Sequence, residues 1–108
     1  MATETFKELA KGQLAASSGL LYTAPAATTV LINQIVLVNT DSSDRTAQLD
    51  HTNGGAAAAG DELLPSSTIV AGGHAEGGGF IMDAGDKIYG SASIVNKVTY
   101  HIYGLELS

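Results

Sequence analysis

The sequence predicts an all-β protein: a single antiparallel β-sandwich, jelly-roll-like, with about seven or eight short strands. Aliphatic and β-branched runs alternate with turn signals about every 8–12 residues, which is typical of such folds. Strand–helix alternation, which indicates a parallel α/β sheet, is missing. The length of 108 residues fits one domain.

Composition limits both the core and the partners. Aromatic residues make up only 6% of the chain, and Trp is absent. The chain has 13 glycines, which add no side chain to a core. The core must therefore be built from Val, Ile, Leu and Ala. The absence of Cys excludes disulfides, thiolate zinc sites and cysteine nucleophiles. With a net charge of −6, the protein lacks the excess of basic residues that is typical of nucleic-acid-binding proteins. An anionic bilayer would repel it. We therefore expect neither nucleic acid nor membrane as a partner.

The first 11 residues predict a short N-terminal arm, followed by a sandwich domain over residues 12–108. Thr5 and Glu8 have the spacing of a capping box, and Gly12 is a suitable residue just past a helix end. A helix this short is marginal alone, so we expect the arm to become ordered by docking. Its charged residues stand where a signal peptide needs an apolar run, so export by that route is not expected.

Strand signals begin after the arm. Residues 28–40 form the strongest, with apolar residues on both faces, so we expect this strand to be covered on both sides. Strict alternation places Leu31, Ile35 and Leu37 on one face and the intervening valines and isoleucine on the other. The predicted strands are 20–24, 28–40, 45–51, 66–71, 80–82, 87–93 and 97–107.

The tyrosines of the last predicted strand are also candidates for oligomer contact or for the core. Alternation places Tyr100 with Val98 and Ile102, and Tyr103 on the opposite face. Core or subunit contact is favoured for these tyrosines over a saccharide shelf. A core this thin also favours self-association, with a closed trimer as the first expectation. The residues assigned to oligomer contact or core are Leu31, Ile35, Leu37, Tyr100 and Tyr103.

Two glycine-rich segments are interpreted as connections. Residues 52–60 predict an exposed loop, because Asn53-Gly54 is a strong turn signal. Residues 72–79 predict a hairpin connection rather than a phosphate-binding loop, because no Lys-Ser/Thr pair follows.

Residue patterns that carry chemistry are sparse. His51, His74 and His101 have none of the spacings of a metal site, so no metal is expected. The serines lack a G-x-S-x-G elbow, and the carboxylates are interpreted as a solvated acidic surface. We expect no enzymatic activity and no cofactor.

Several blocks, in order, resemble small virion proteins of tailed bacteriophages. These blocks are residues 21–26 (LYTAPA), 28–40 (TTVLINQIVLVNT), 82–92 (MDAGDKIYGSA) and 98–106 (VTYHIYGLE). The resemblance covers residues 12–107. It implies a structural protein of the particle, either a head decoration (cement) protein or a tail or fibre component, with no catalytic residues to carry over.

A compact acidic domain with an arm favours decoration of the head, because like-charged copies resist premature aggregation. We then expect a homo-oligomer on the exterior of the phage head, made in the host cytoplasm and bound to the major capsid protein. The alternative is a tail, baseplate or fibre component that recognises host saccharide through Asn53, His74 and Glu76. The expected shell-contact residues are Thr5, Phe6, Leu9, Lys11 and Leu14.

Overall fold

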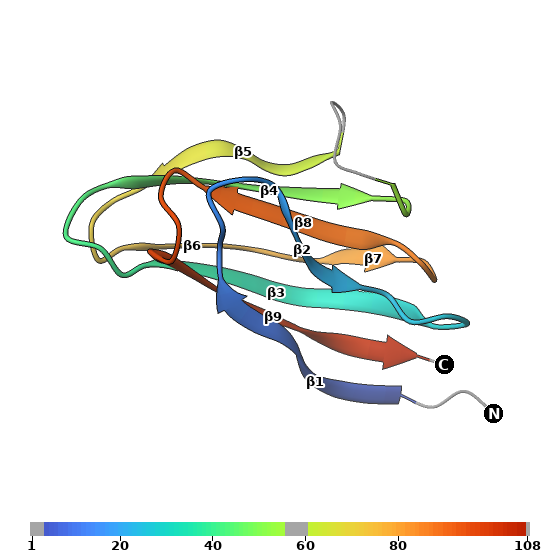
Figure 1. Cartoon of the computed structure of the whole chain (residues 1–108). Helices are drawn as coiled ribbons and strands as arrows, with labels where there is room; N and C mark the ends of the chain where they lie inside the picture. The colour runs from blue at the N-terminus through green and yellow to red at the C-terminus, as the bar shows by residue number, and fades with distance from the viewer. Residues whose placement is uncertain (1–3, 56–60, 108) are drawn as a thin grey trace.

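The computed structural model describes residues 4–55 and 61–107, which form nine β-strands and no helix. The strands lie in two antiparallel sheets packed against each other, and the first and last described residues, Glu4 and Leu107, are paired at one end of the sandwich (Figure 1). The strands are β1 (Glu4–Gln13), β2 (Gly19–Thr23), β3 (Thr29–Asn39), β4 (Arg45–Thr52), β5 (Glu62–Ile69), β6 (His74–Gly77), β7 (Phe80–Met82), β8 (Lys87–Ala92) and β9 (Val98–Leu107).

Strand order defines a jelly roll. The β1 sheet has the order β1-β9-β3-β6, with β7 also paired to β3, and the β2 sheet has the order β2-β8-β4-β5. Because β6 and β7 pair with successive parts of β3, they act as one interrupted strand. With β6 and β7 counted as one strand, every connection crosses from one sheet to the other except β4–β5. This is the order of the eight strands in a jelly roll. The predicted fold class is confirmed.

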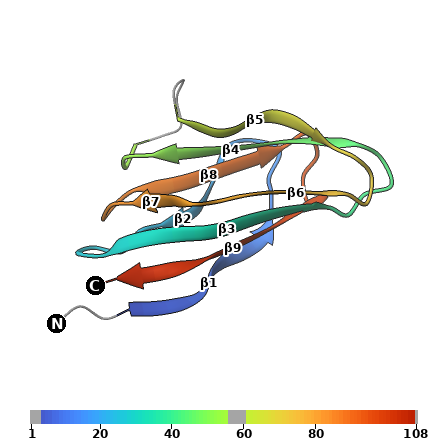
Figure 2. The ribbon, with the colours of Figure 1, turned by 180° about the vertical axis from the view of Figure 1, so that it is seen from behind.

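The predicted N-terminal helix is wrong: Glu4–Gln13 is an edge strand. It pairs with β9 from Glu4 opposite Leu107 to Gln13 opposite Thr99 (Figure 2). Without β1, β9 would present a long row of unpaired backbone groups, whereas a helix of two turns repays little of its nucleation cost. The expected boundary between residues 11 and 12 falls inside this strand. Residues 1–3 lie outside the described residues.

A β-bulge in β3 overturns the strict alternation predicted for this strand. The pairing with β9 shifts between Ile32 and Gln34, so Asn33 is an extra residue. Such a one-residue shift exchanges the faces of everything beyond it. Ile35 and Leu37 therefore share the buried face, while Leu31 is exposed on the outer one. The buried residues of β3 are Val30, Ile32, Ile35, Leu37 and Asn39.

The glycine-rich segment is only partly a connection, because His74–Gly77 forms β6 on the edge of β3. Gly78 has a φ of 153°, and a Cβ there would collide with the carbonyl oxygen of Asn33 in the bulge. The two irregularities therefore lie against each other. They explain why the strand beside β3 is interrupted between β6 and β7.

The core fills the space between the sheets and is aliphatic, as predicted. Tyr22, Phe80 and Tyr100 pack against it without being fully buried. Leu14, just after β1, is wholly buried. The buried hydrophobic residues are Leu14, Ala24, Val30, Ile32, Ile35, Leu37, Ala47, Leu49, Ile69, Met82, Ile88, Ala92, Val98 and Ile102. The described residues contain no helix long and apolar enough to cross a membrane.

Candidate interaction surface

The outer face of the β1 sheet, which we call the β1-sheet face, is rich in apolar and aromatic side chains. In each strand the residues between the buried ones point outward, away from the β2 sheet. The two central strands, β3 and β9, carry no charged residue on this side. The outward residues of these two strands and β7 include Leu31, Val36, Val38, Ile81, Thr99, His101, Tyr103 and Leu105.

Three aliphatic residues form a row across this face. Leu31 pairs with Ile81 on one side and with Leu105 on the other. Ile81 is 60% exposed and Leu31 is 40% exposed. A contiguous exposed apolar row of this kind marks an interaction site more often than a lone exposed leucine does.

Two rings stand beside this row on β9. His101 and Tyr103 are stacked, with centroids 6.1 Å apart and planes within 1° of each other. The Nδ1 atom of His101 is buried and has no hydrogen-bond partner in the structure.

Charged side chains lie only at the edges of the β1-sheet face. Glu8 and Lys11 stand on β1, opposite Tyr103 and His101. Glu76 stands on β6 and accepts a hydrogen bond of 2.6 Å from Gln34 Nε2. The face therefore has an apolar centre and a polar rim, which is the anatomy of a protein–protein interface.

The residues predicted for oligomer contact or core divide between the two roles. Leu31 and Tyr103 lie on the β1-sheet face. Ile35 and Leu37 are core residues, each at most 2% exposed. Tyr100 points inward, and its hydroxyl would lie 3.1 Å from a Cβ added at Gly12. Gly12 thus provides room for this ring, a packing role in place of the helix end that we predicted.

The predicted shell-contact residues are not all accessible. Leu14 is wholly buried, so its assignment to shell contact is wrong. Leu9 is the bulged residue of β1 and packs against the core. Lys11 is exposed on the β1-sheet face. Thr5 and Phe6 belong to β1, but their side chains lie outside the described residues.

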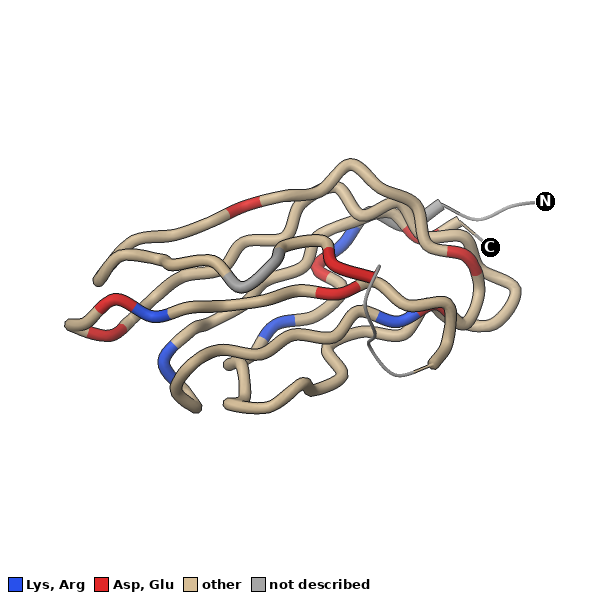
Figure 3. Tube along the Cα trace, turned by 90° about the horizontal axis from the view of Figure 1, so that it is seen from above, with Lys and Arg blue, Asp and Glu red and all other residues tan. Residues whose placement is uncertain are grey.

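The outer face of the β2 sheet is more polar. Gln48 on β4 donates to Asp50 on the same strand, with both oxygens at 3.3 Å from Nε2. Leu20 on β2, opposite Tyr89, is 52% exposed. The few Lys and Arg residues of the described chain lie apart and form no basic patch (Figure 3).

An apolar cleft of about 150 Å³ opens between the free edges of β5 and β6. Leu63, Leu64 and Phe80 line it together with core residues of β3 and β4. Its position between two edge strands reflects the open side of the sandwich, where no strand joins the sheets.

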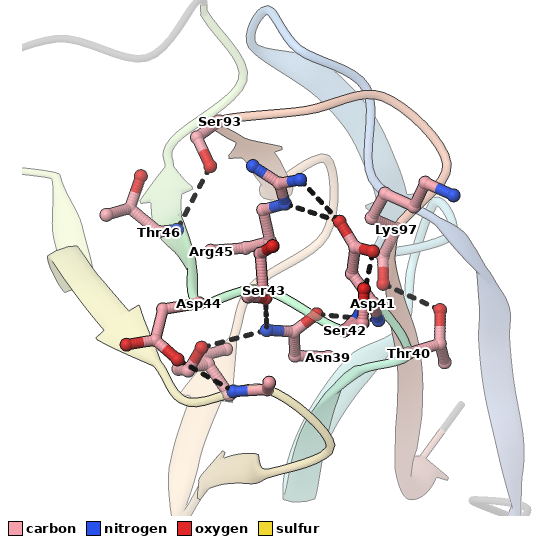
Figure 4. Close-up of polar contacts among 12 residues, drawn as sticks. Asn39, Thr40, Asp41, Ser42, Ser43, Asp44, Arg45, Thr46, Ser93 and Lys97 are labelled. Carbon is pink, nitrogen blue, oxygen red and sulfur yellow. Dashed lines mark hydrogen bonds and ion pairs between the residues drawn. The ribbon is translucent and has the colours of Figure 1, made fainter.

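Asn39 joins the loops (Figure 4) at the end of the sandwich opposite the start of β1 and the end of β9 (Figure 1). Its Nδ2 donates to the carbonyl oxygens of Ser43 and Ile69, both at 2.9 Å, and of Val70 at 3.2 Å. Its Oδ1 accepts from the backbone N–H of Asp41 at 2.9 Å. One buried amide therefore holds the β3–β4 turn against the end of β5.

Asp41 and Arg45 close the same turn. Arg45 Nε donates to Asp41 Oδ2 at 2.7 Å, and Ser42 N donates to Asp41 Oδ1 at 2.7 Å. The Arg45 hydrogen bond, followed by that of Ser42, holds the pKa of Asp41 below its usual value. The acidic run at residues 41–44 is thus used locally to fix the turn.

A second hydrogen-bonded cluster closes the opposite end. Asp86 is 5% exposed. Its Oδ2 atom forms a hydrogen bond of 3.0 Å with His51 Nε2 and accepts one of 3.0 Å from the backbone N–H of Asp83. Asn53 Nδ2 adds a longer bond of 3.3 Å. Burial opposes ionisation of Asp86, but these hydrogen bonds outweigh it and keep its pKa below the usual value.

Because its pKa is lowered by folding, Asp86 stabilises the protein above the unfolded value of about 3.9 and loses this contribution as pH falls through the folded value. We expect Asp86→Asn to make stability fall less steeply below about pH 4 than in the wild type. Denaturant unfolding at several pH values measures this slope. Asn33→Ala, which removes no titratable group at an exposed position, is the control and should keep the wild-type slope. Equal slopes for the wild type and Asp86→Asn would contradict the prediction.

Glu106 joins the two sheets beside the chain ends. It accepts a 2.7 Å hydrogen bond from the Tyr22 hydroxyl on β2 and pairs with Lys7 on β1 at 2.9 Å. The Tyr22 and Lys7 hydrogen bonds lower the pKa of Glu106. Burial and the Glu106 carboxylate raise the pKa of Tyr22. This edge of the sandwich is therefore closed, unlike the β5–β6 edge.

The side chains considered for chemistry remain dispersed. His51 lies in the Asp86 cluster, and His101 lies on the β1-sheet face. Among residues 4–55 and 61–107, no three His, Cys, Asp or Glu side chains gather as a metal site would require. His74 and Glu76 lie together on β6, but Asn53 is bonded to Asp86 near the other end. The saccharide-contact set is not brought together.

No protein-family model and no curated protein matches this chain. A solved structure, of infectious bursal disease virus (Gx strain), contains a chain of similar fold. The match has a TM-score of 0.55 at 10% identity, and it covers 99% of this chain and 37% of the viral chain. At this identity the likeness concerns the fold alone, so the chain shares a β-sandwich fold with part of a viral protein.

Proposed function

We propose that the protein is a structural component of a virus particle, a capsid decoration (cement) protein of a tailed bacteriophage that binds the head shell as a homo-oligomer. The β1-sheet face is the observation that carries this proposal. It offers an exposed apolar centre with a charged rim, which needs a protein partner. A second copy of the chain is such a partner, and the resulting homo-oligomer presents its remaining surfaces to the lattice.

Two further features support the proposal. The jelly roll recurs in viral capsid domains, and a part of a chain from infectious bursal disease virus shares this fold. The net charge of −6 opposes non-specific aggregation of free protein before a scaffold gathers it. Many weak contacts, multiplied by the symmetry of the shell, then hold each copy in place.

Particle composition tests the proposal. Quantitative mass spectrometry of purified particles should find hundreds of copies, because decoration follows the lattice of the major capsid protein. A handful of copies would contradict decoration and favour the tail, baseplate or fibre alternative. Retention of the protein on a glycan array would support the same alternative.

Binding to heads gives a second readout. Purified protein added to expanded heads that lack it should sediment with them. Deleting residues 2–11 is a poor probe of shell contact, because it removes most of β1 and uncovers the edge of β9. Particles that carry no copies and heads that bind none would together overturn the proposal.

A further inference from the structure

We propose that two copies of this chain associate face to face through the β1-sheet face, with Lys11 of each copy opposite Glu76 of the other. This inference rests on the proposed function for the expectation that the chain works as an assembly, and it adds which surface joins the copies and in what register.

The composition of the face supplies the first argument. Leu31, Ile81 and Leu105 form its aliphatic row, with Tyr103 beside them on β9. Sheets with apolar faces pack about 10 Å apart with their side chains interdigitated. The same face of a second copy carries the same aliphatic row, so each copy covers the exposed Leu31 and Ile81 of the other.

The size of the face supplies the second argument. Strands β1 and β9 have 10 residues each and β3 has 11. With the interrupted β6/β7 strand they span about 34 Å by 19 Å, or roughly 650 Å². A stable interface uses about 800 Å² of each partner, so the face approaches the required area without help from the loops.

Strand register supplies the third argument, which fixes the orientation. Lys11 on β1 is opposite His101 on β9, His101 is opposite Val36 on β3, and Val36 is opposite Glu76 on β6. These four residues therefore form one row that runs from edge to edge. Lys11 and Glu76 are its two charged ends.

A two-fold axis parallel to the strands places the β1 edge of one copy over the β6 edge of the other at the same level. Lys11 then meets Glu76 of the second copy, and the pair occurs twice. Lys11 makes no ion pair within residues 4–55 and 61–107. Because like surfaces meet, the contact closes as a dimer and replaces the trimer that we first expected.

Sedimentation equilibrium of the full chain tests the apolar centre. The wild type should be a concentration-dependent dimer, and Leu31→Asp should weaken it at least about tenfold. Leu20→Asp is the matched control, because Leu20 is an exposed leucine on the other sheet, and it should leave the dimer unchanged. Ile81→Asp provides a second variant if Leu31→Asp does not fold, as judged by circular dichroism.

Charge exchange tests the register. Lys11→Glu and Glu76→Lys should each weaken the dimer, and the double variant should restore it, because only the facing pair regains opposite charges. A monomeric or trimeric wild type, equal effects of Leu20→Asp and Leu31→Asp, or a double variant as weak as the single ones would overturn the inference.

The two proposals fail separately. A monomeric chain that still decorates heads overturns this inference and the homo-oligomeric state, and leaves the proposed decoration of the head shell standing. If the chain is a dimer that responds to charge exchange as expected but is absent from particles, the proposed function is overturned. The association surface then still stands.

Discussion

Replacing Gly104 with alanine is expected to destabilise the protein by about 3 kcal/mol, near the upper end for overpacking a core. Gly104 lies on β9, between β1 and β3, with its α-carbon facing the core. A Cβ there would collide with the carbonyl oxygen of Leu31 and lie 2.9 Å from Leu9 Cδ1. Because β9 is hydrogen-bonded on both sides, the collision cannot be relieved without disturbing one of the two ladders. Denaturant unfolding measures the loss.

Gly77→Ala is the matched control on the same sheet. A Cβ at Gly77 meets nothing within 4 Å. We expect a change of less than about 1 kcal/mol, and a stabilising one where the loss of chain freedom in the unfolded state dominates. A loss as large as that of Gly104→Ala would show that the sheet is sensitive to any lost glycine. The close contact with Leu31 would then not be the cause.

Asn39→Asp is expected to cost a similar amount, about 3 kcal/mol, because it places an acceptor where the native amide donates. The Asn39 amide nitrogen is buried among the carbonyl oxygens of Ser43, Ile69 and Val70. A carboxylate has no proton to give them and would itself be buried without a positive partner. For a domain of this size the thermal midpoint should fall by roughly 12–24 °C.

Asn33→Asp makes the same chemical change at an exposed position of the same strand. It should shift stability by no more than about 0.5 kcal/mol, as surface substitutions usually do. Thermal melts of the two variants beside the wild type provide the comparison. Equal losses would refute the role of Asn39 as the residue that joins the loops.

The candidate surface was only partly predictable. The apolar residues on both faces of β3 indicate a strand covered on both sides, and Leu31 and Tyr103 are among the residues that the sequence assigns to oligomer contact or core. Their partner Ile81 was missed, because β7 has only three residues and its outward face shows no pattern of its own. Glu76 was considered only for saccharide, since its place beside Lys11 follows from pairing between distant strands.

Leu14 is a residue that the sequence assigns to the surface but the structure buries. Its position next to the predicted arm favoured shell contact, yet the turn after β1 brings it into the core beside Gly90. The helix prediction failed for a related reason. Local spacing at Thr5 and Glu8 fits a helix, but the open edge of β9, at the other end of the chain, offers nine residues of backbone pairing.

The amino-acid order alone determined the fold class, the aliphatic core and most strand positions, because alternation, β-branched residues and turn formers act over a few neighbouring residues. Tertiary structure alone decided the role of β1, the faces of β3 beyond Asn33 and the row that joins Lys11 to Glu76. Each of these depends on pairing between segments far apart in the chain, and one bulged residue reverses which side chains are buried.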